Sequence, residues 1–347
     1  MAHGHSRIVR LGHGRKIIER AGRAAAIIVR VSGEGSHRLR WEQLPDHVQG
    51  AVANRLGSRV VRAEGQRGGY GPGVAARCQL ADGRRVFVKA VSPAQNPESP
   101  AMMRREASLV ARLPAEVPAP RLLEVLDDGT WIVLVFEEVR GRQPTIPWSL
   151  PELRRVSEGL SDLRCHPPPA GWPNLAEQYG SLLTGWRTLA AEAVAEPALD
   201  IWCRDHLDDL AALEAGWEAA ASGEELVHGD VRSDNVLLVD DAGGRVKAGV
   251  VFVDWSSASA GAGWFDLAAM LPSVALEGGG APEAVLATAR GASVDPTLLP
   301  PVVAALAGYF LEAARRPDPS GLPTVRAFQR AQGEVALAWL RRLLRWD

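Results

Sequence analysis

The chain has 347 residues, enough for two domains that each bury a hydrophobic core. Apolar residues make up 46% of it and charged residues 23%, and no apolar run approaches the roughly 20 residues that span a bilayer. Its net charge of −2 combines nine basic and two acidic residues in positions 1–40 with seventeen basic and twenty-seven acidic residues in positions 141–347. We therefore expect no membrane partner, and no nucleic-acid partner because no folded segment is basic.

The first forty positions and the cysteines indicate the compartment. Positions 1–40 are basic and lack aromatic side chains, so we expect a flexible N-terminal extension rather than a nucleic-acid arm. The apolar stretch 24–29 is too short for the core of a signal peptide. The cysteines, Cys78, Cys165 and Cys203, have neither the number of a disulfide framework nor the spacing of a zinc site. We predict a cytoplasmic protein and leave monomer and homodimer open.

Positions 41–140 predict a β-rich N-lobe with one internal helix. Apolar residues recur every four positions from Leu44 to Leu56 and indicate a first helix. A glycine-rich turn at 65–73 and further Asp-Gly turns then separate short runs rich in β-branched residues, the pattern of hairpins. We expect helices over 41–56 and 102–113, and strands over 59–63, 74–80, 85–91, 122–126 and 131–139.

Positions 141–347 predict a mostly helical C-lobe with an embedded hairpin. Helical periodicity extends over 150–164, 175–194, 198–221, 281–289, 300–316 and 325–346. Two apolar strands are expected over 235–239 and 246–253, joined by an Asp-Asp-Ala-Gly-Gly turn. The fold class predicted is α+β, with a basic extension over 1–40, an N-lobe over 41–140 and a C-lobe over 141–347.

Three polar residues flank the predicted hairpin. Asp230 and Asn235 precede its first strand, and Asp254 ends its second, so pairing of the strands would bring Asn235 and Asp254 together. Carboxylate and amide oxygens suit Mg²⁺, which prefers one or two such ligands with phosphate oxygens. Asp230 would then orient an attacking hydroxyl and accept its proton, the arrangement of kinase phosphoryl transfer. Alone, each fragment is also compatible with a turn or a cap.

Lys89 is one of three lysines among thirty-nine basic residues. It lies inside an apolar strand, where alternation places it on the same face as Phe87. Kinases use a lysine here to hold the α- and β-phosphates of the nucleotide, oriented by a glutamate of the following helix, and Glu106 is suitably placed. An exposed edge lysine is the alternative, which the scarcity of lysine disfavours.

Two further segments suggest nucleotide contacts. The turn at 65–73 carries Gly69, Gly71 and Gly73, which permit close backbone approach to phosphates, although it lacks the Walker sequence. The end of the last N-lobe strand would form a hinge whose backbone pairs with adenine, at Phe136, Glu137 and Val139. We expect the side chains of Glu137 and Glu138 to be exposed. Asp266 is expected to be an N-cap or a buried salt-bridge partner, and His228 a structural hydrogen-bonding residue.

These residues resemble the motifs of the aminoglycoside phosphotransferase family, which has a two-lobed protein-kinase-like fold. The resemblance covers about 40–346 and is carried by His228-Gly229-Asp230 with Asn235, Val253-Asp254-Trp255, Trp264-Phe265-Asp266-Leu267-Ala268, and Lys89 with Glu106. It implies Asp230 as catalytic aspartate, Asn235 and Asp254 as Mg²⁺ ligands and Lys89 as a ligand of the ATP phosphates. A protein kinase is disfavoured, because Gly229 replaces the arginine of its catalytic triplet.

The resemblance leaves the acceptor open. The segment 189–225 holds ten acidic residues and one basic residue, and in the family helices here help to form the acceptor side of the cleft. Asp205, Asp209 and Asp234 are therefore candidate ligands for a cationic acceptor, the alternative being a solvated helical face. Aminoglycoside kinases often end in acidic residues, whereas this chain ends Arg341-Arg342-Leu343-Leu344-Arg345-Trp346-Asp347, which argues against an aminoglycoside.

The function predicted is transfer of the γ-phosphate of ATP, with GTP left open, to a hydroxyl of a small molecule. An antibiotic or related metabolite is the acceptor we favour, with resistance by O-phosphorylation as the role. The alternatives are a metabolic kinase of the choline or homoserine type and a catalytically silent protein that binds nucleotide. The second is disfavoured because each catalytic position is filled.

Overall fold

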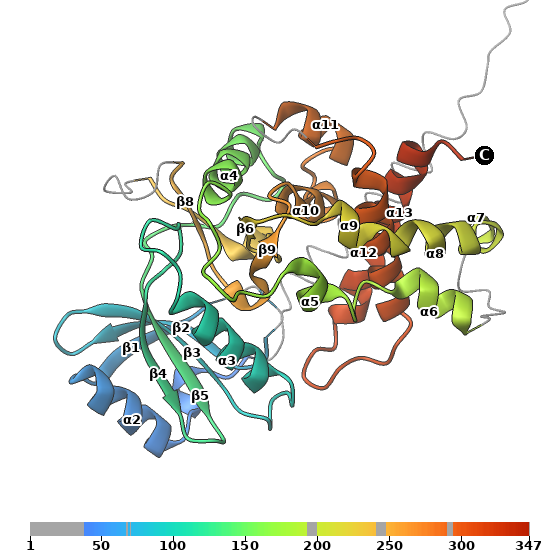
Figure 1. The fold of residues 1–347 in the computed structure, drawn as a ribbon. Helices are drawn as coiled ribbons and strands as arrows, with labels where there is room; N and C mark the ends of the chain where they lie inside the picture. The colour runs from blue at the N-terminus through green and yellow to red at the C-terminus, as the bar shows by residue number, and fades with distance from the viewer. Residues whose placement is uncertain are drawn as a thin grey trace, which may run out of the picture.

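The computed structural model describes residues 38–66, 69, 71–192, 200–240, 248–289 and 294–346. These residues form a β-rich N-lobe and a mostly helical C-lobe (Figure 1), so the predicted fold class is confirmed. Positions 1–37 of the predicted extension, most of the predicted turn at 240–244 and the start of the second predicted hairpin strand lie outside the described residues. The boundaries predicted between extension, N-lobe and C-lobe stay predictions.

An antiparallel sheet forms the N-lobe, with five strands in the order β1-β2-β3-β5-β4 among the described residues. Strands β2 and β3 span the residues predicted for them, because the glycine-rich turn and the Asp82-Gly83 turn bound β2, and Pro93 follows β3. The strands are β1 (Val60–Gly65), β2 (Val74–Leu80), β3 (Arg85–Val91), β4 (Leu122–Asp127) and β5 (Ile132–Glu137).

One helix covers each face of this sheet. Helix α2 (Asp46–Leu56) packs on the face that carries Val86 and Val88 of β3, and helix α3 (Ser99–Val110) contacts β4 and β5. The helix predicted over 41–56 is interrupted, because Pro45 caps α2 after a short 3-10 turn, η1 (Trp41–Gln43). Alternation along β3 directs Phe87 and Lys89 to the face opposite α2, where both line the cleft between the lobes.

The C-lobe helices surround two small antiparallel sheets. Two helices predicted as continuous are divided: 175–194 into α5 and α6, and 198–221 into α7, α8 and α9. Among the described residues, no helix is both long and apolar enough to cross a membrane. The helices are α4 (Leu150–Leu163), α5 (Leu175–Tyr179), α6 (Gly185–Ala191), α7 (Ile201–Asp205), α8 (Leu207–Ala215), α9 (Trp217–Ala220), α10 (Phe265–Leu276), α11 (Pro282–Thr288), α12 (Leu299–Ala313) and α13 (Val325–Leu344).

The small sheets position the loops that face the N-lobe. Strand β7 (Val236–Leu238) pairs with β8 (Val250–Phe252), so the predicted hairpin is present and is shorter than expected. Strand β6 (Glu225–Val227) pairs with β9 (Ser259–Gly261), a sheet that the sequence did not predict. The loop after β6 and the loop after β8 both emerge at the cleft, which brings two polar segments together.

Candidate functional site

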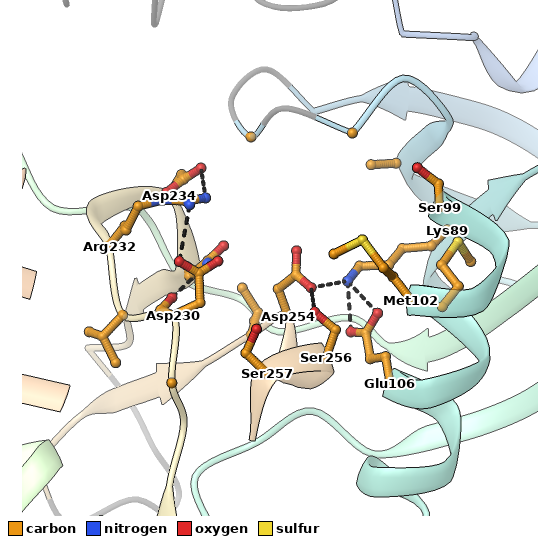
Figure 2. Close-up of a pocket in the computed structure, with 18 of the residues that line it drawn as sticks. Lys89, Ser99, Met102, Glu106, Asp230, Arg232, Asp234, Asp254, Ser256 and Ser257 are labelled. Atoms are coloured by element: carbon orange, nitrogen blue, oxygen red, sulfur yellow. Dashed lines mark hydrogen bonds and ion pairs between the residues drawn. The ribbon is translucent and has the colours of Figure 1, made fainter. Parts of the chain in front are cut away.

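A cleft of about 820 Å³ lies between the two lobes. Strands β2 and β3 and helix α3 line it from the N-lobe, whereas the loops after β6 and β8 and helices α12 and α13 line it from the C-lobe. Figure 2 shows Asp230, Arg232 and Asp234 on one side of the cleft and Lys89 with Glu106 on the other, with Asp254 between them.

Asp230 lies in the loop after β6, and its carboxylate has two partners. One oxygen accepts a hydrogen bond from Arg232 Nη1 at 3.0 Å, and the other accepts one from Asn235 Nδ2 at 3.1 Å. The same Asn235 nitrogen donates to the Asp230 carbonyl at 2.8 Å, which closes the loop on itself. Burial raises the pKa of Asp230, and the Arg232 guanidinium opposes this shift. The arrangement holds a carboxylate at the cleft with its orientation fixed by two donors.

Asp254 follows β8 and lines the same cleft as Asn235. The Val253 amide donates to the Asn235 carbonyl at 3.0 Å, so pairing of the hairpin continues one step beyond its strands and places the two side chains at the same end. Asp254 has a left-handed backbone, with φ 68°, a conformation that aspartate tolerates better than most residues and that recurs at functional sites. This backbone turns its carboxylate toward the N-lobe.

Lys89 contacts one carboxylate from each lobe, Glu106 of the N-lobe and Asp254 of the C-lobe. Its Nζ lies 2.7 and 2.8 Å from the two oxygens of Glu106 and 3.4 Å from Asp254 Oδ1. Burial works against the charge of Lys89, but Asp254 and Glu106 outweigh it and raise the lysine pKa. Burial likewise opposes ionisation of Asp254, and Lys89 holds the pKa of that carboxyl below its usual value. The predicted Lys89–Glu106 pair is therefore present and extends to Asp254.

His228 and Asp266 stabilise the loop after β6 that carries Asp230. The Asp266 carboxylate accepts hydrogen bonds from the backbone amides of His228 and Gly229, both at 2.7 Å, so the expected N-cap or salt bridge was wrong. Helix α10 has Trp264 as its N-cap, without a side-chain cap bond. His228 is fully buried, and its Nε2 lies 3.0 Å from the Val253 carbonyl, which agrees with a structural role. Burial lowers the pKa of His228 and raises that of Asp266.

The glycine-rich turn and the hinge both line the cleft. Gly69, Gly71 and Gly73 do so, whereas Gly68 and Tyr70 of the same turn lie outside the described residues. A Cβ at Gly73 would lie 2.3 Å from the Ala90 carbonyl oxygen, so only glycine allows this turn to close on β3. Phe136, Glu137 and Val139 line the cleft as well.

The two hinge glutamates are engaged, which corrects the expectation of simple exposure. Glu137 pairs with Arg121 at 2.9 Å. Glu138 pairs with Arg85 at 2.5 Å and Arg77 at 3.7 Å, and its side chain is 4% exposed. No sequence signal indicates these partners, because Arg77 and Arg85 lie on β2 and β3 and Arg121 directly precedes β4.

Asp205 and Asp209 lie away from the cleft, which corrects their prediction as acceptor ligands. Both are exposed, and neither is among the residues that line the cleft. Figure 1 shows α7 and α8, which carry them, at the edge of the C-lobe that is remote from the sheet. Asp234 does line the cleft, but both its carboxylate oxygens accept hydrogen bonds from Arg232, at 3.0 and 3.1 Å.

Arg38 is a cleft residue that the sequence did not reveal. The Leu39 amide donates to the Pro72 carbonyl at 3.2 Å, which ties residues 38–40 to the glycine-rich turn and corrects the expectation of flexibility for them. Arg38 lines the cleft, and a Cβ at Gly69 would lie 2.5 Å from its Nη2. Burial lowers the pKa of Arg38, and the carboxylates of Asp254 and Asp234 oppose this. Its guanidinium therefore lies between the turn and the acidic loops.

Glu277 lies outside the cleft but supports the loop after β6. One carboxylate oxygen accepts from Ser233 Oγ and the other from Trp148 Nε1, each at 2.7 Å, so the residue ties that loop to the segment before α4. Burial raises its pKa. A glutamate directly after the apolar helix α10 was the available signal in the sequence.

The side-chain oxygens of Asn235 and Asp254 fit a hard divalent cation that also binds phosphate oxygens. Asn235 donates a hydrogen bond from its amide nitrogen to Asp230, which directs the amide oxygen elsewhere, and Asp254 adds a carboxylate that lines the cleft. Among the described residues, no group of three or more His, Cys, Asp or Glu side chains could hold a metal. Mg²⁺ commonly uses one or two protein oxygens with phosphates and waters, so the two residues match that ion rather than a closed protein site.

The fold and these residues define a phosphotransferase of the two-lobed, protein-kinase-like class. The family model described as the Phosphotransferase enzyme family, APH, matches residues 75–309, which is more than half of the chain. The chain belongs to this family of phosphotransferase enzymes. No curated protein matches it.

Several solved structures share the fold at low sequence identity. Choline kinase LicA from Streptococcus pneumoniae superposes with a TM-score of 0.52 at 12% identity, covering 86% of this chain and 98% of that chain. The GDP and kanamycin complex of APH(2")-IIia has a TM-score of 0.54 at 15% identity, with coverage of 86% and 98%. The GDP complex of aminoglycoside 2'-phosphotransferase-IIIa has a TM-score of 0.54 at 15% identity, with coverage of 86% and 97%. These likenesses establish the fold.

Proposed function

We propose that this chain transfers the γ-phosphate of ATP or GTP to a hydroxyl group of a small molecule, an antibiotic or a related metabolite. One observation carries the proposal: Asp230, Asn235 and Asp254 face a single cleft together with the Lys89–Glu106 pair. Each of these groups corresponds to a requirement of phosphoryl transfer, namely a proton acceptor, two metal ligands and a cation for the phosphates.

Asp230 is assigned to the acceptor hydroxyl. Its carboxylate is held by Arg232 and Asn235, so it can receive a hydrogen bond from the hydroxyl without reorganising. The hydroxyl oxygen forms a bond to the γ-phosphorus while the bond from that phosphorus to the β–γ bridging oxygen breaks. The nucleoside diphosphate leaves, and the hydroxyl proton passes to Asp230.

The nucleotide is assigned to the N-lobe side of the cleft. Lys89 binds the α- and β-phosphates, Glu106 orients it, and the amides around Gly69, Gly71 and Gly73 approach the phosphates. Backbone groups of the hinge, from Phe136 to Val139, face the base. Asn235 and Asp254 would hold Mg²⁺, which neutralises charge on the phosphate oxygens when it is bound. Binding of GDP in the two aminoglycoside phosphotransferase structures above supports a nucleotide here.

The test is Asp230→Asn, compared with Asp205→Asn as a matched control outside the cleft. Removing the proton acceptor should lower kcat by about 10²–10⁴-fold, because that is the usual contribution of a positioned general base. The dissociation constant of the nucleotide, measured by calorimetry, should change by less than about threefold. The control should keep full activity. Unchanged turnover in Asp230→Asn would exclude the assigned mechanism.

A further inference from the structure

The C-lobe side of the cleft presents an apolar surface next to Asp230. We define the acceptor wall as the lining residues that α12, α13 and the segment after α5 contribute. Its apolar side chains are Leu182, Leu306, Tyr309, Phe310, Val325 and Phe328. Its polar side chains on α13 are Arg326, Gln329 and Gln332. Leu182 is 48% exposed, so apolar surface is available to a ligand. A wall of this composition gains free energy by covering an apolar or aromatic body.

The cations at this wall are arginines. Arg326, in the first turn of α13, donates from Nε to the Pro317 carbonyl at 3.1 Å and from Nη1 to Gln329 Oε1 at 2.8 Å. Both partners are neutral oxygens, so these contacts orient the guanidinium without neutralising its charge. Arg232 lies with its Cζ 5.8 Å from the centre of the Phe328 ring. Arg232 shares its charge with the carboxylates of Asp230 and Asp234, so the positive charge that the apolar wall adds is that of Arg326.

Few carboxylates remain for a cationic acceptor. Among the described residues that line the cleft from the C-lobe, the acids are Asp230, Asp234 and Asp254. Arg232 engages Asp234 with two hydrogen bonds, Asp254 pairs with Lys89, and Asp230 is assigned to the hydroxyl. An ammonium group that leaves water needs a negatively charged partner to offset the free-energy cost of its desolvation. A molecule with several ammonium groups would find too few such partners here, so its binding would be weak.

The segment between α12 and α13 closes the wall against the N-lobe. The Asn96 side-chain amide donates to the Ser320 carbonyl at 3.0 Å, across the two lobes. A Cβ at Gly321 would lie 2.7 Å from the Gln95 carbonyl oxygen and 3.3 Å from Pro72 Cβ, so this loop touches the N-lobe directly. Pro319 and Leu322 of the same segment line the cleft. The acceptor therefore enters a pocket that is bounded on the N-lobe side as well.

We infer that the acceptor is an uncharged or anionic alcohol with an apolar or aromatic body, and that Arg326 binds a polar oxygen of that body. The inference rests on the proposed function, because it concerns the second substrate of the same site. It differs from the cationic acceptor that the acidic segment 189–225 suggested. Arg326 is a specificity residue in this assignment, and the chemistry at Asp230 is unchanged by it.

The test uses aryl glycosides that share one aromatic body and differ in charge. The probes are 4-nitrophenyl β-D-glucopyranoside, the corresponding glucuronide, the corresponding 2-amino-2-deoxy-glucoside and the polycation kanamycin. Dissociation constants are measured by calorimetry on the full chain with nucleotide present. We expect the neutral and anionic glycosides to bind at least about tenfold more tightly than the amino glycoside, the usual scale of one charge-assisted contact.

Two variants of α13 then test the arginine. Arg326→Ala should reduce the preference for the glucuronide over the neutral glycoside by about tenfold. Arg330→Ala, which removes an exposed arginine outside the cleft on the same helix, should leave this preference unchanged. Thermal unfolding of both variants identifies any loss of folding.

The inference is overturned if the amino glycoside or kanamycin binds as tightly as the neutral glycoside. It is also overturned if Arg326→Ala keeps the preference, or if neither the neutral nor the anionic glycoside binds at about 10 mM, since that is weaker than ordinary substrate recognition. Phosphorylation of kanamycin that depends on Asp230 would leave the proposed function standing and refute the inference alone. If the wild-type chain bound neither ATP nor GTP in the same calorimetric measurement, the proposed function itself would be refuted.

Discussion

The two sides of the cleft are built from different chemistry. On the nucleotide side, Lys89 lies within 3.4 Å of carboxylate oxygens from Glu106 and Asp254, and the turn before β2 is closed by glycine. On the acceptor side, the acceptor wall is apolar apart from arginine and glutamine side chains. The nucleotide side meets a ligand that every kinase shares, whereas the acceptor side must fit the substrate of this chain. The difference suggests that the two substrates can be perturbed separately.

Lys89→Met should have the largest effect on activity of the variants considered, and this effect should be limited to the kinetic constants of the nucleotide. The change removes the cation at the phosphates while keeping the volume, and kcat/KM for the nucleotide should fall by roughly 10²–10³-fold. Burial raises the pKa of Glu106 to about 7, so this carboxyl can take up a proton when its partner is lost, which limits the cost in stability. Steady-state kinetics should show KM for the acceptor within about twofold of the wild type.

Arg104→Ala is the matched control for this prediction. Arg104 also forms an ion pair, with Asp127 at 2.7 Å, but it does so on the outer side of α3 and does not line the cleft. Its removal should leave both KM values unchanged. A large rise in acceptor KM in Lys89→Met would mean that the two sides of the cleft are coupled, contrary to the comparison.

The same comparison explains what the sequence could predict. The sequence signal for Asp230, Asn235 and Asp254 was their position within one stretch of the chain that forms a hairpin. The signal for Lys89 was that a lysine in an apolar strand is unusual in this chain. Strands β2 and β3 were found because turns mark both their ends. These are local signals.

The residues of the acceptor side could not be predicted from the sequence, because they are far apart along the chain. Tyr309 and Arg326 lie far along the chain from Asp230 and meet it only when α12 and α13 pack together. Composition also misled the prediction, since the acidic residues Asp205 and Asp209 proved to be a solvated surface. Strands β6 and β9 are three residues each, too short for a period to be recognised.

Arg38→Ala should have an intermediate effect on KM for ATP. Such an effect would show that a residue before the predicted N-lobe, 41–140, also contributes to nucleotide binding. The guanidinium lies between the glycine-rich turn and the carboxylates of Asp234 and Asp254, where it would meet the phosphates of a bound nucleotide. Its loss should raise KM for ATP by about tenfold, the scale of one charge-assisted hydrogen bond. Arg40→Ala, an exposed neighbour outside the cleft, serves as the control. A fall in KM for ATP would mean that Arg38 obstructs the nucleotide.

Glu152→Gln should have the smallest effect on activity, because Glu152 contacts neither side of the cleft. Its carboxylate, on α4, accepts hydrogen bonds from the Thr145 amide at 3.0 Å and hydroxyl at 2.7 Å, and pairs with Arg142 at 2.6 Å. These contacts tie the segment between β5 and α4 to the C-lobe. We expect kcat/KM within about twofold of the wild type and a loss of about 1 kcal/mol in the free energy of unfolding at neutral pH, measured with urea.

The pH dependence of this loss identifies the carboxylate as its cause. Burial opposes ionisation of Glu152, but the Thr145 and Arg142 contacts outweigh it and lower the pKa from 4.5 to about 2. A lowered pKa contributes stability that is complete above pH 4.5 and disappears as the pH falls toward 2. The difference between wild type and Glu152→Gln should therefore shrink across that window. Glu158→Gln, an exposed change on the same helix, should show no such dependence, and a constant difference for Glu152→Gln would point to packing instead.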